Sequence, residues 1–450
     1  MTAASPRPVA AIILAAGKGT RMKSSLHKVL HPLAGRPMLL HLLASVDMLG
    51  VAAKVIVVGA GRQQVEAAVI RLDARVVVQE PQLGTGHAVQ QAQSALIGFD
   101  GDILILYGDV PLVETATMRR MLDALSDDVA AVVLGFRPED PAAYGRILAH
   151  GGIIDRMVEY KDASDAERAV TLCNSGLLAI RAADLWPLLA KVGNDNAAGE
   201  YYLPDVVGLA NRPSRVIETS AAEVAGINSR GELATVEAGW QQARRAAMMA
   251  AGVTLVAPET VWFSHDTQVA ADVSIEPNVW FGTGVSIAAG SRIRAFSHIE
   301  GATVGENVEV GPYARLRTGA VLGNRSKVGN FVEVKNATLG ERAKASHLTY
   351  LGDADVGAGA NIGAGTITCN YDGFFKYRTN IGADAFIGSN SALVAPVSIG
   401  AGAIVGAGST ITADVEPGAL GLGRGSQSGK PGWATRFRAA MTARKTAGKA

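Results

Sequence analysis

Cysteine, net charge and long apolar runs are all scarce in this chain of 450 residues. Its two cysteines, Cys173 and Cys369, cannot build a disulfide framework, which favours a reducing compartment. A formal charge of +1 gives no general attraction to nucleic acid or to an anionic membrane. No apolar run approaches the ~18 residues of a membrane span. We therefore expect a cytoplasmic protein that binds neither nucleic acid nor membrane.

The first apolar run, residues 9–16, is short and is followed by Lys18, Arg21 and Lys23. A secretory signal would have its charges before the apolar core and small residues at a cleavage site after it. The run is rich in small and β-branched residues, which is typical of a buried parallel strand. We expect a strand here and not a signal peptide.

Up to about residue 229, strand-like and helix-like stretches alternate. The strand-like runs are 54–59, 102–109 and 130–136, and the helix-like stretches are 87–96 and 115–125. This alternation predicts an α/β domain with a parallel sheet. Residues 230–250 contain no proline and are rich in Ala, Glu, Gln, Arg and Met, so they predict a connecting helix.

From about residue 251 the chain repeats every six residues. The two longest runs of aliphatic residues in steps of six are Val304, Val310, Leu316, Leu322, Val328, Val334 and Ile381, Ile387, Leu393, Ile399, Val405, Ile411; a shorter run is Val273, Val279, Val285. A period of six fits neither a helix nor an isolated alternating strand, but it fits a hexapeptide solenoid of short strands and turns. We expect one aliphatic side chain per repeat inside the prism, and glycine at the corners to permit positive φ.

One segment breaks the six-residue period. Between Ile362 and Ile381 the sequence reads "GAGTITCNYDGFFKYRTN", whose second half is polar and aromatic. Loops inserted on one face of a solenoid are often binding sites. After Glu416 the chain has no acidic residue and several basic ones, which predicts a solvated basic tail.

The turn after the first strand, "AAGKGTRM", offers backbone N–H groups and two cations to a phosphate. It is not the dinucleotide fingerprint, because Met22 stands where the third glycine belongs, and the P-loop pattern is also absent. Taken alone, the turn fits a tight structural turn as well as a phosphate-binding loop.

A wider set of motifs carries a resemblance to a known family. The segment "LAAGKGTRMKSSLHKVLHPLAG" resembles the signature of sugar-nucleotide pyrophosphorylases, with His27 in place of the family's proline before Lys28. Further matching motifs are "QEPQLGTGHA", "LYGDVPL", "YGRI", "VEYKDA", "NSGLLA", "GEYYLPD" and "GINSR". Together with the hexapeptide half, nearly the whole chain resembles the bacterial bifunctional N-acetylglucosamine-1-phosphate uridylyltransferases and glucosamine-1-phosphate N-acetyltransferases.

The resemblance implies a domain organisation and two reactions. It implies a Rossmann-like uridylyltransferase domain over 1–229, a helical linker over 230–250, and a left-handed parallel β-helix with acetyltransferase activity over 251–450. Acetyl-CoA would acetylate glucosamine 1-phosphate, and UTP would then react with N-acetylglucosamine 1-phosphate to give UDP-N-acetylglucosamine and pyrophosphate. Magnesium (Mg2+), acetyl-CoA as co-substrate and a homotrimer are further expectations, as is the supply of the product to cell-envelope synthesis.

The candidate uridylyltransferase site centres on Asp109, which follows a strand at the sheet edge where open α/β sheets bind ligands. The resemblance makes Asp109 a Mg2+ ligand together with Asn228. It implies that Arg21 and Lys28 hold the triphosphate. It assigns uracil to Gln79, Gly84 and Thr85, the N-acetylglucosamine portion to Gly145, Glu159 and Asn174, and further substrate contacts to Leu14, Ala15, Ala16, Gly17, Tyr107 and Gly108.

The candidate acetyltransferase site centres on His347. The attacking amine must lose a proton, and histidine titrates in the useful range. A lone histidine in a repeat protein is commonly structural, but "SHLTYLGDADVG" matches the family's acetyltransferase motif. Arg317 and Lys335, about one 18-residue coil apart, could jointly hold a sugar phosphate. The resemblance assigns the amino sugar to Tyr350 and Asn361, and acetyl-CoA to Ala364, Asn370, Tyr371, Ser389, Ala407 and Arg424.

Two other functions remain open at this stage. The chain could be a pyrophosphorylase with one activity, whose solenoid serves only in oligomerisation; His347, Lys335 and the inserted loop argue against this. It could also be a non-catalytic assembly subunit, against which Asp109 and Lys28 argue. A zinc site of three histidines is not indicated, because the solenoid histidines are isolated.

Overall fold

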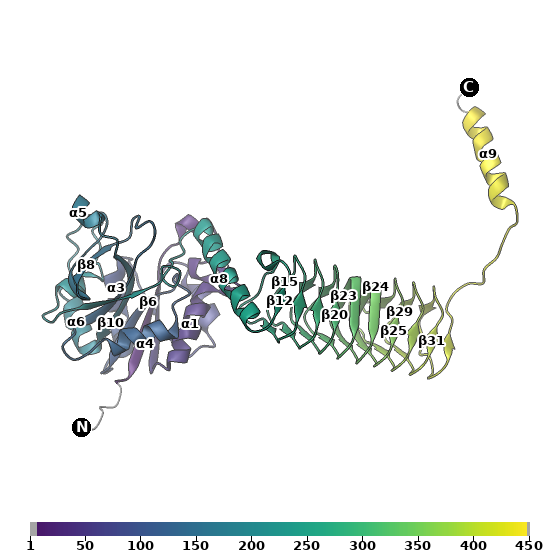
Figure 1. The fold of residues 1–450 in the computed structure, drawn as a ribbon, viewed down its shortest axis with the longest axis horizontal. Coiled ribbons are helices and arrows are strands. Elements are labelled where there is room, and N and C mark those ends of the chain that lie inside the picture. The colour runs from purple at the N-terminus through teal and green to yellow at the C-terminus, as the bar shows by residue number, and fades with distance from the viewer. Residues whose placement is uncertain (1–6, 448–450) are drawn as a thin grey trace. The chain divides into compact units, whose positions relative to one another are not determined.

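The computed structural model, in which residues 7–447 are described, divides into two compact units between Arg244 and Arg245. Helix α8 (Arg230–Ala250) covers the range over which the sequence predicts a helix, and the boundary between the units falls inside it (Figure 1). Within the described residues, no helix is both long and apolar enough to cross a membrane.

The N-terminal unit is built on a nine-stranded sheet with the order β5-β4-β1-β6-β10-β7-β11-β9-β8. Its strands are β1 (Val9–Ala15), β4 (Ala53–Val58), β5 (Arg75–Val78), β6 (Asp102–Tyr107), β7 (Ala131–Phe136), β8 (Arg146–His150), β9 (Ile153–Val158), β10 (Cys173–Arg181) and β11 (Arg215–Thr219), beside a small hairpin of β2 (Pro32–Leu33) and β3 (Arg36–Pro37). Its helices are α1 (Met38–Leu49), α2 (Arg62–Val69), α3 (Thr85–Gln91), α4 (Thr115–Asp123), α5 (Asp165–Arg168), α6 (Ala182–Leu189) and α7 (Asp205–Gly208).

The sheet is mixed, so the expectation of a parallel sheet holds for only part of it. Strands β5, β4, β1 and β6 pair in parallel, as predicted. Strand β10 runs antiparallel to both β6 and β7, and β9 antiparallel to β11. Between β7 and β10 the chain forms the β8–β9 hairpin and only a four-residue helix, α5, instead of a long crossover helix. An antiparallel return requires no such crossover.

Helices cover both faces of this sheet (Figure 1). On β1, Ile13 joins the core formed with α1 and α4, whereas its neighbour Ile12 joins the core formed with α3 and α6. Both side chains are fully buried. Because successive side chains of a strand point to opposite faces, a strand buried on both sides must be apolar throughout. This explains the unbroken apolar run at residues 9–16.

The C-terminal unit is a parallel β-solenoid, which confirms the fold predicted from the six-residue period. Each strand pairs in parallel with one a full coil away, as β14 does with β17 and β17 with β20. The strands are β12 (Thr254–Leu255), β13 (Gln268–Val269), β14 (Ser274–Ile275), β15 (Trp280–Phe281), β16 (Ser286–Ile287), β17 (Arg292–Ile293), β18 (His298–Ile299), β19 (Ala302–Val304), β20 (Glu309–Val310), β21 (Arg315–Leu316), β22 (Ala320–Leu322), β23 (Lys327–Leu339), β24 (Lys344–Val356), β25 (Asn361–Ile362), β26 (Ile367–Cys369), β27 (Thr379–Ile381), β28 (Phe386–Ile387), β29 (Ala392–Val394), β30 (Val397–Ile399), β31 (Ile404–Val405), β32 (Thr410–Ile411) and β33 (Leu420–Gly421). Helix α9 (Trp433–Ala447) in the basic tail has no buried residue.

The aliphatic residues of all three six-residue runs are buried, as predicted. A second inward position lies two residues earlier in each repeat, as Val308 does before Val310. The run beginning at Val273 belongs to that second position, because Ile275 fills the first. Two side chains per repeat therefore fill the prism, where we expected one.

Glycine serves two purposes in the solenoid: the positive φ that we expected at corners, as at Gly365 and Gly408, and a close approach of coils that we did not expect. Gly357 directly follows a buried aliphatic residue, and a Cβ added to it would stand 2.4 Å from the backbone nitrogen of Ala383 on the next coil. Such glycines allow close approach of the coils, whereas the positive φ lies two residues later, at Gly359. At many corners the positive φ belongs to other residues, including Phe331 and Asp353. Four of these corners lie within the long strands β23 and β24, so the expected pattern of short strands and turns is wrong there.

Candidate functional site

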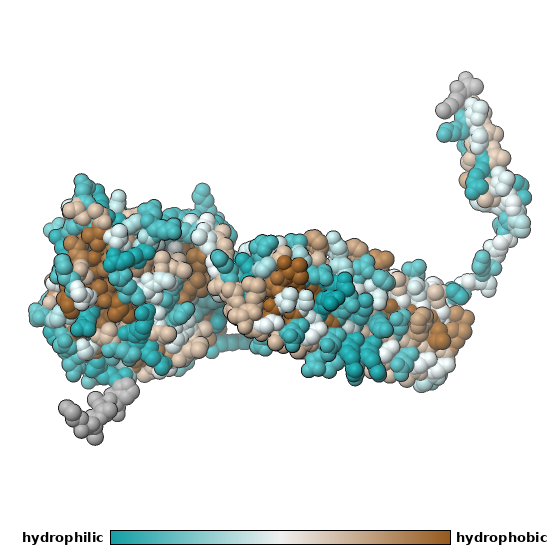
Figure 2. All heavy atoms as spheres, in the orientation of Figure 1, coloured by the Kyte–Doolittle hydropathy of each residue, from teal (hydrophilic) through white to brown (hydrophobic). Residues whose placement is uncertain are grey.

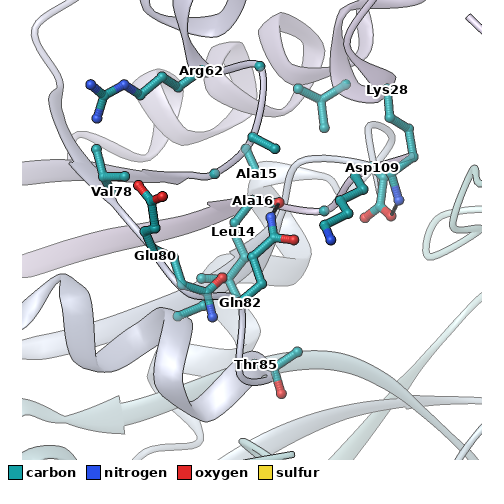
Figure 3. A pocket seen from close by; sticks show the side chains of 18 of the residues that line it. Leu14, Ala15, Ala16, Lys28, Arg62, Val78, Glu80, Gln82, Thr85 and Asp109 are labelled. Carbon is teal, nitrogen blue, oxygen red and sulfur yellow. Dashed lines mark hydrogen bonds and ion pairs between the residues drawn. The ribbon is translucent and has the colours of Figure 1, made fainter. Parts of the chain in front are cut away.

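A cavity of about 990 Å³ lies where β1, β4 and β6 end. The sequence-predicted residues that line it are Leu14, Ala15, Ala16, Gly17, Lys28, Gln79, Gly84, Thr85, Tyr107 and Asp109. In Figure 3, Lys28 and Asp109 lie at one end of this cavity, and Arg62 and Glu80 lie at the other. Parallel strands that end at one edge of a sheet bring their following loops together, which explains how residues so far apart in sequence meet.

One ammonium group joins the two predicted metal ligands. Lys28 Nζ forms an ion pair with the Asp109 carboxylate and donates a hydrogen bond to Asn228 Oδ1 at 3.0 Å. The Ile227 N–H donates to the Asp109 carbonyl at 2.9 Å, which brings Asn228 beside Asp109. A carboxylate oxygen of Asp109 and the amide oxygen of Asn228 thus converge on the single positive charge of Lys28. Within residues 7–447, no group of three or more His, Cys, Asp or Glu side chains could hold a metal.

The glycine turn leads into Lys28 through His27, the residue that replaces the family's proline. His27 has φ −58°, a value that proline would also impose, so the backbone angle at this position is compatible with proline. Its N–H, which proline would lack, donates to Gln64 Oε1 at 2.8 Å. Its imidazole is buried without a partner on either ring nitrogen, and burial, followed by the Lys28 charge, lowers its pKa. Arg21 is exposed and does not line the cavity.

The far wall of the cavity is held by amide side chains. Gln79 is buried, and its Nε2 donates to the Gly84 carbonyl at 2.9 Å. Gln82, which our prediction missed, donates from Nε2 to the Ala16 carbonyl and lines the cavity. Its position inside "QEPQLGTGHA" was the available signal. Burial raises the pKa of Tyr107, a change that the hydrogen bond with Thr85 partly offsets.

Arg62, which no sequence motif indicated, also lines the cavity. Glu80 and Glu200 line it too; they lie in the motifs "QEPQLGTGHA" and "GEYYLPD", but our prediction did not single them out. Gly108 does not line it; a Cβ added there would meet Val29 at 3.3 Å, so this glycine lets the strand end pack closely.

A second cavity, of about 410 Å³, brings together the three residues predicted to hold the sugar. The Asn174 N–H donates to the Gly145 carbonyl at 2.9 Å. A Cβ on Gly145 would stand 3.4 Å from both carboxylate oxygens of Glu159, so glycine leaves these oxygens accessible. Burial raises the pKa of Glu159, and the nearby carboxylates of Asp205 and Asp162 raise it further.

In the solenoid, His347 lies exposed on β24. Its Nδ1 is 2.6 Å from Oδ1 of Asn330, the residue that pairs with it on the preceding coil. Since an amide oxygen can only accept, Nδ1–H donates and Nε2 keeps its lone pair. This is the tautomer that a base acting through Nε2 requires. Our sequence analysis missed Asn330, which lies one coil before His347.

Three cations gather on one side of the solenoid. Arg317 and Lys335 follow Leu316 and Val334, which pair across neighbouring coils, so the two cations are adjacent as predicted from their spacing. Arg317 Nη1 donates to Glu333 Oε1 at 2.8 Å, and this bond raises the pKa of Arg317. Lys376 of the inserted loop, which we missed, lies beside Lys335 and lowers its pKa through close contact and charge repulsion. Together these three side chains form a cluster of positive charge, here called the cation group.

The residues predicted for acetyl-CoA divide between a corner of the prism and the inserted loop. At the corner, the Ala364 carbonyl accepts from Asn390 N–H at 2.8 Å and the Ser389 carbonyl accepts from Gly408 N–H at 2.8 Å. The next link is Ala407, whose carbonyl accepts from Arg424 Nη1 at 2.6 Å. These residues form a column on successive coils.

The same column reaches the candidate base, because Gly365 N–H donates to the carbonyl of Leu348, the neighbour of His347, at 3.0 Å. Tyr350 lies on β24 and pairs with Glu333, whereas Asn361 lies on β25 and pairs with Lys344.

Asn370 and Tyr371 belong instead to the inserted loop. The Asn370 side chain is buried and donates its amide to Asp353. Tyr371 is exposed, and its backbone pairs with Lys376.

Comparison with known proteins identifies both parts of the chain. Residues 11–175 match the model of the MobA-like NTP transferase domain, and residues 301–336 and 378–413 match the model of bacterial transferase hexapeptide repeats.

Relatives named "Bifunctional protein GlmU" are similar over nearly the full length. The one from Sphingopyxis alaskensis is 67% identical, covering 98% of each chain. The one from Rhizorhabdus wittichii is 68% identical, covering 98% of this chain and 99% of the relative, and that from Novosphingobium aromaticivorans is 64% identical, covering 97% and 98%. The chain therefore belongs to the GlmU family of bifunctional proteins.

Proposed function

We propose that each of the two compact units carries one activity of this bifunctional transferase. The chain makes UDP-N-acetylglucosamine in two steps: acetyl transfer to glucosamine 1-phosphate, then uridylyl transfer from UTP to N-acetylglucosamine 1-phosphate. The assignment of sites rests on one observation: the two sets of residues lie in separate units. One set surrounds Asp109 in the N-terminal unit, and the other surrounds His347 in the solenoid.

In the N-terminal unit, Asp109 and Asn228 fit Mg2+. Hard oxygen donors, few in number, suit an ion that takes its other ligands from water and substrate phosphates, and these two oxygens already converge on the Lys28 ammonium. When bound, Mg2+ would neutralise charge on the reacting phosphates. Lys28, released from the two oxygens, would then hold a phosphate. Gly145 and Glu159 would orient the sugar so that its phosphate oxygen attacks the α-phosphorus of UTP and pyrophosphate leaves.

In the solenoid, His347 Nε2 would accept a proton from the amino group of glucosamine 1-phosphate as the nitrogen attacks the thioester carbon of acetyl-CoA. The C–N bond forms, the C–S bond breaks, and the sulfur of the coenzyme takes up the proton from His347 and leaves as the thiol. Asn330 holds the imidazole in the tautomer that this transfer requires. Arg317, Lys335 and Lys376 would bind the sugar phosphate, and the column from Ala364 to Arg424 would bind the coenzyme.

The proposal includes a homotrimer and a cytoplasmic location. Apolar side chains reach the surface of the solenoid (Figure 2), and Phe296, Tyr313 and Phe331 are about half exposed there. Their rings stack with centroids 4.9 Å and 5.2 Å apart along successive coils. A continuous exposed aromatic row supports association between copies of the chain.

The proposed cytoplasmic location follows from the substrates, since UTP and acetyl-CoA are both cytoplasmic metabolites.

The test supplies acetyl-CoA, glucosamine 1-phosphate, UTP and Mg2+ and follows the products by chromatography. We expect N-acetylglucosamine 1-phosphate first and UDP-N-acetylglucosamine later. Chelation of Mg2+ should stop the synthesis at N-acetylglucosamine 1-phosphate, because uridylyl transfer depends on the ion and acetyl transfer does not. Loss of both products on chelation, or release of coenzyme thiol without an acetylated sugar, would contradict the assignment.

A further inference from the structure

A buried aspartate lies behind the cation group of the solenoid. Asp353 is 9% exposed and occupies a corner of β24 with φ +48°. One of its oxygens, Oδ1, accepts from Asn336 Nδ2 at 2.6 Å, and the other, Oδ2, accepts from Asn370 Nδ2. Both oxygens of a single carboxylate are thus used, by residues from two different segments of the chain.

Each of these two segments carries a lysine of the cation group. Asn336 directly follows Lys335 on β23, so its bond to Asp353 fixes the backbone next to that lysine. Asn370 opens the inserted loop that carries Lys376, and its carbonyl accepts from Tyr377 N–H at 2.9 Å, which closes the loop base. The bond from Asn370 to Asp353 therefore anchors the whole loop.

We infer that Asp353 is a positioning residue of the acetyltransferase site, which holds Lys335 and Lys376 side by side so that together they bind the phosphate of the sugar substrate. The inference rests on the proposed role of these lysines in acetyl transfer. Asp353 itself is buried behind them and does not touch the substrate.

The electrostatics agree with this role. Lys335 and Lys376 repel one another, and Arg317 adds to the repulsion. Burial raises the pKa of Asp353, but the bonds from Asn336 and Asn370 and the charges of both lysines outweigh that effect and lower it overall. An ionised carboxylate behind two like charges reduces the cost of keeping them close before the phosphate arrives.

The test is Asp353→Asn in the full-length chain, measured by acetyl transfer. The change keeps the shape but removes the charge and turns one acceptor into a donor facing another donor. We expect KM for glucosamine 1-phosphate to rise roughly 10- to 100-fold, as for the loss of hydrogen bonds to a charged group. The kcat should stay within a few-fold, because His347 and Asn330 are untouched. Asp384→Asn is the matched control, since Asp384 also occupies a corner with positive φ but is exposed.

A double-mutant cycle separates positioning from general loss of structure. If Asp353 acts through the loop lysine, Asp353→Asn should add little to the KM increase caused by Lys376→Ala. Fully additive effects, or an unchanged KM in folded Asp353→Asn, would overturn the inference. If Asp353→Asn unfolds, the double variant Asp353→Asn with Asn370→Asp replaces it. This exchange restores every donor–acceptor pair and should restore KM for glucosamine 1-phosphate. A folded exchange variant with a raised KM would also overturn the inference. An unmutated chain without acetyl transfer would instead refute the proposed function.

Discussion

Most of the residues proposed for nucleotidyl transfer line cavities of about 990 and 410 Å³, whereas His347 and the column of expected coenzyme residues lie along the outside of a coil. The cause lies in the folds. Strands that end at one edge of a sheet direct their loops toward a common space, but a solenoid displays equivalent residues of successive coils in straight columns. A concave site can be complete within one chain. A column on an outer corner stays open on one side, so we expect the proposed trimer to complete only the solenoid site, which copies of the chain would then share.

The largest effect is expected from Asp109→Ala, which should lower uridylyl transfer by roughly 10³-fold or more, since several kcal/mol of charge stabilisation depend on the metal site. Acetyl transfer should be nearly unchanged, because His347 lies in a unit with its own core. Asp47→Ala is a suitable control, since Asp47 also pairs with a lysine but away from the cavity. Comparable uridylyl-transfer rates in Asp109→Ala and the unmutated chain at saturating Mg2+ would refute the role of Asp109.

His347→Ala should lower kcat of acetyl transfer by ~10²- to 10⁴-fold, the range expected for a general base. KM should change little, because the cation group remains, whereas Arg317→Ala should mainly raise KM. A histidine with only a structural role would lower the melting temperature and both substrate affinities together. Measuring kcat, KM and melting temperature on one preparation distinguishes these cases.

Low pH should destabilise the N-terminal unit. Burial lowers the pKa values of His27 and His31, so the unfolded chain binds protons below pH ~6.5 while the folded chain does not. The free energy of unfolding therefore falls with pH below that value, until the lowered folded pKa is reached.

His27→Pro should weaken this pH dependence. Between pH 7 and pH 5, its melting temperature should fall by a few degrees less than that of the unmutated chain. At pH 7 its loss of the N–H bond to Gln64 should be roughly offset by the backbone restriction that proline imposes. The exposed His347, replaced by alanine, provides the control. An unchanged pH dependence in His27→Pro would show that His27 is not the group responsible.

The smallest effect should come from separating the units. A chain beginning at Arg245, where the second unit begins, should form a trimer and keep acetyl transfer within a few-fold of the full chain. Light scattering and a thiol-release assay measure both properties. An active monomer would remove the reason for expecting acetyltransferase sites shared between copies.

The sequence predicted most of what is repetitive or local and less of what depends on tertiary contacts. The aliphatic runs predicted the solenoid because an inward aliphatic position recurs in every six-residue repeat, as Val310 and Leu316 illustrate. The antiparallel direction of β10 could not be predicted, because it depends on how the β8–β9 hairpin returns the chain. Lys376 was missed because its importance arises only where the inserted loop approaches Lys335.

The same distinction applies to His347 and Asn330. The histidine was found through a local motif, whereas its partner required knowledge of the pairing between coils. The two residues are 17 positions apart, one fewer than the 18-residue coil implied by the six-residue period, so that period alone would indicate Gly329 as the neighbour of His347. The convergence of Lys28, Asp109 and Asn228 depends on three segments of one fold, and only the family resemblance pointed to it.

Mixing two variants that each lack one activity tests the central claim, that two independent sites act in turn. Asp109→Ala and His347→Ala are supplied separately and then together with acetyl-CoA, glucosamine 1-phosphate, UTP and Mg2+, and UDP-N-acetylglucosamine is measured. We predict that Asp109→Ala alone accumulates N-acetylglucosamine 1-phosphate, that His347→Ala alone leaves the sugar unacetylated, and that the mixture makes UDP-N-acetylglucosamine. A mixture that makes none, while each variant retains its other activity, would contradict the account.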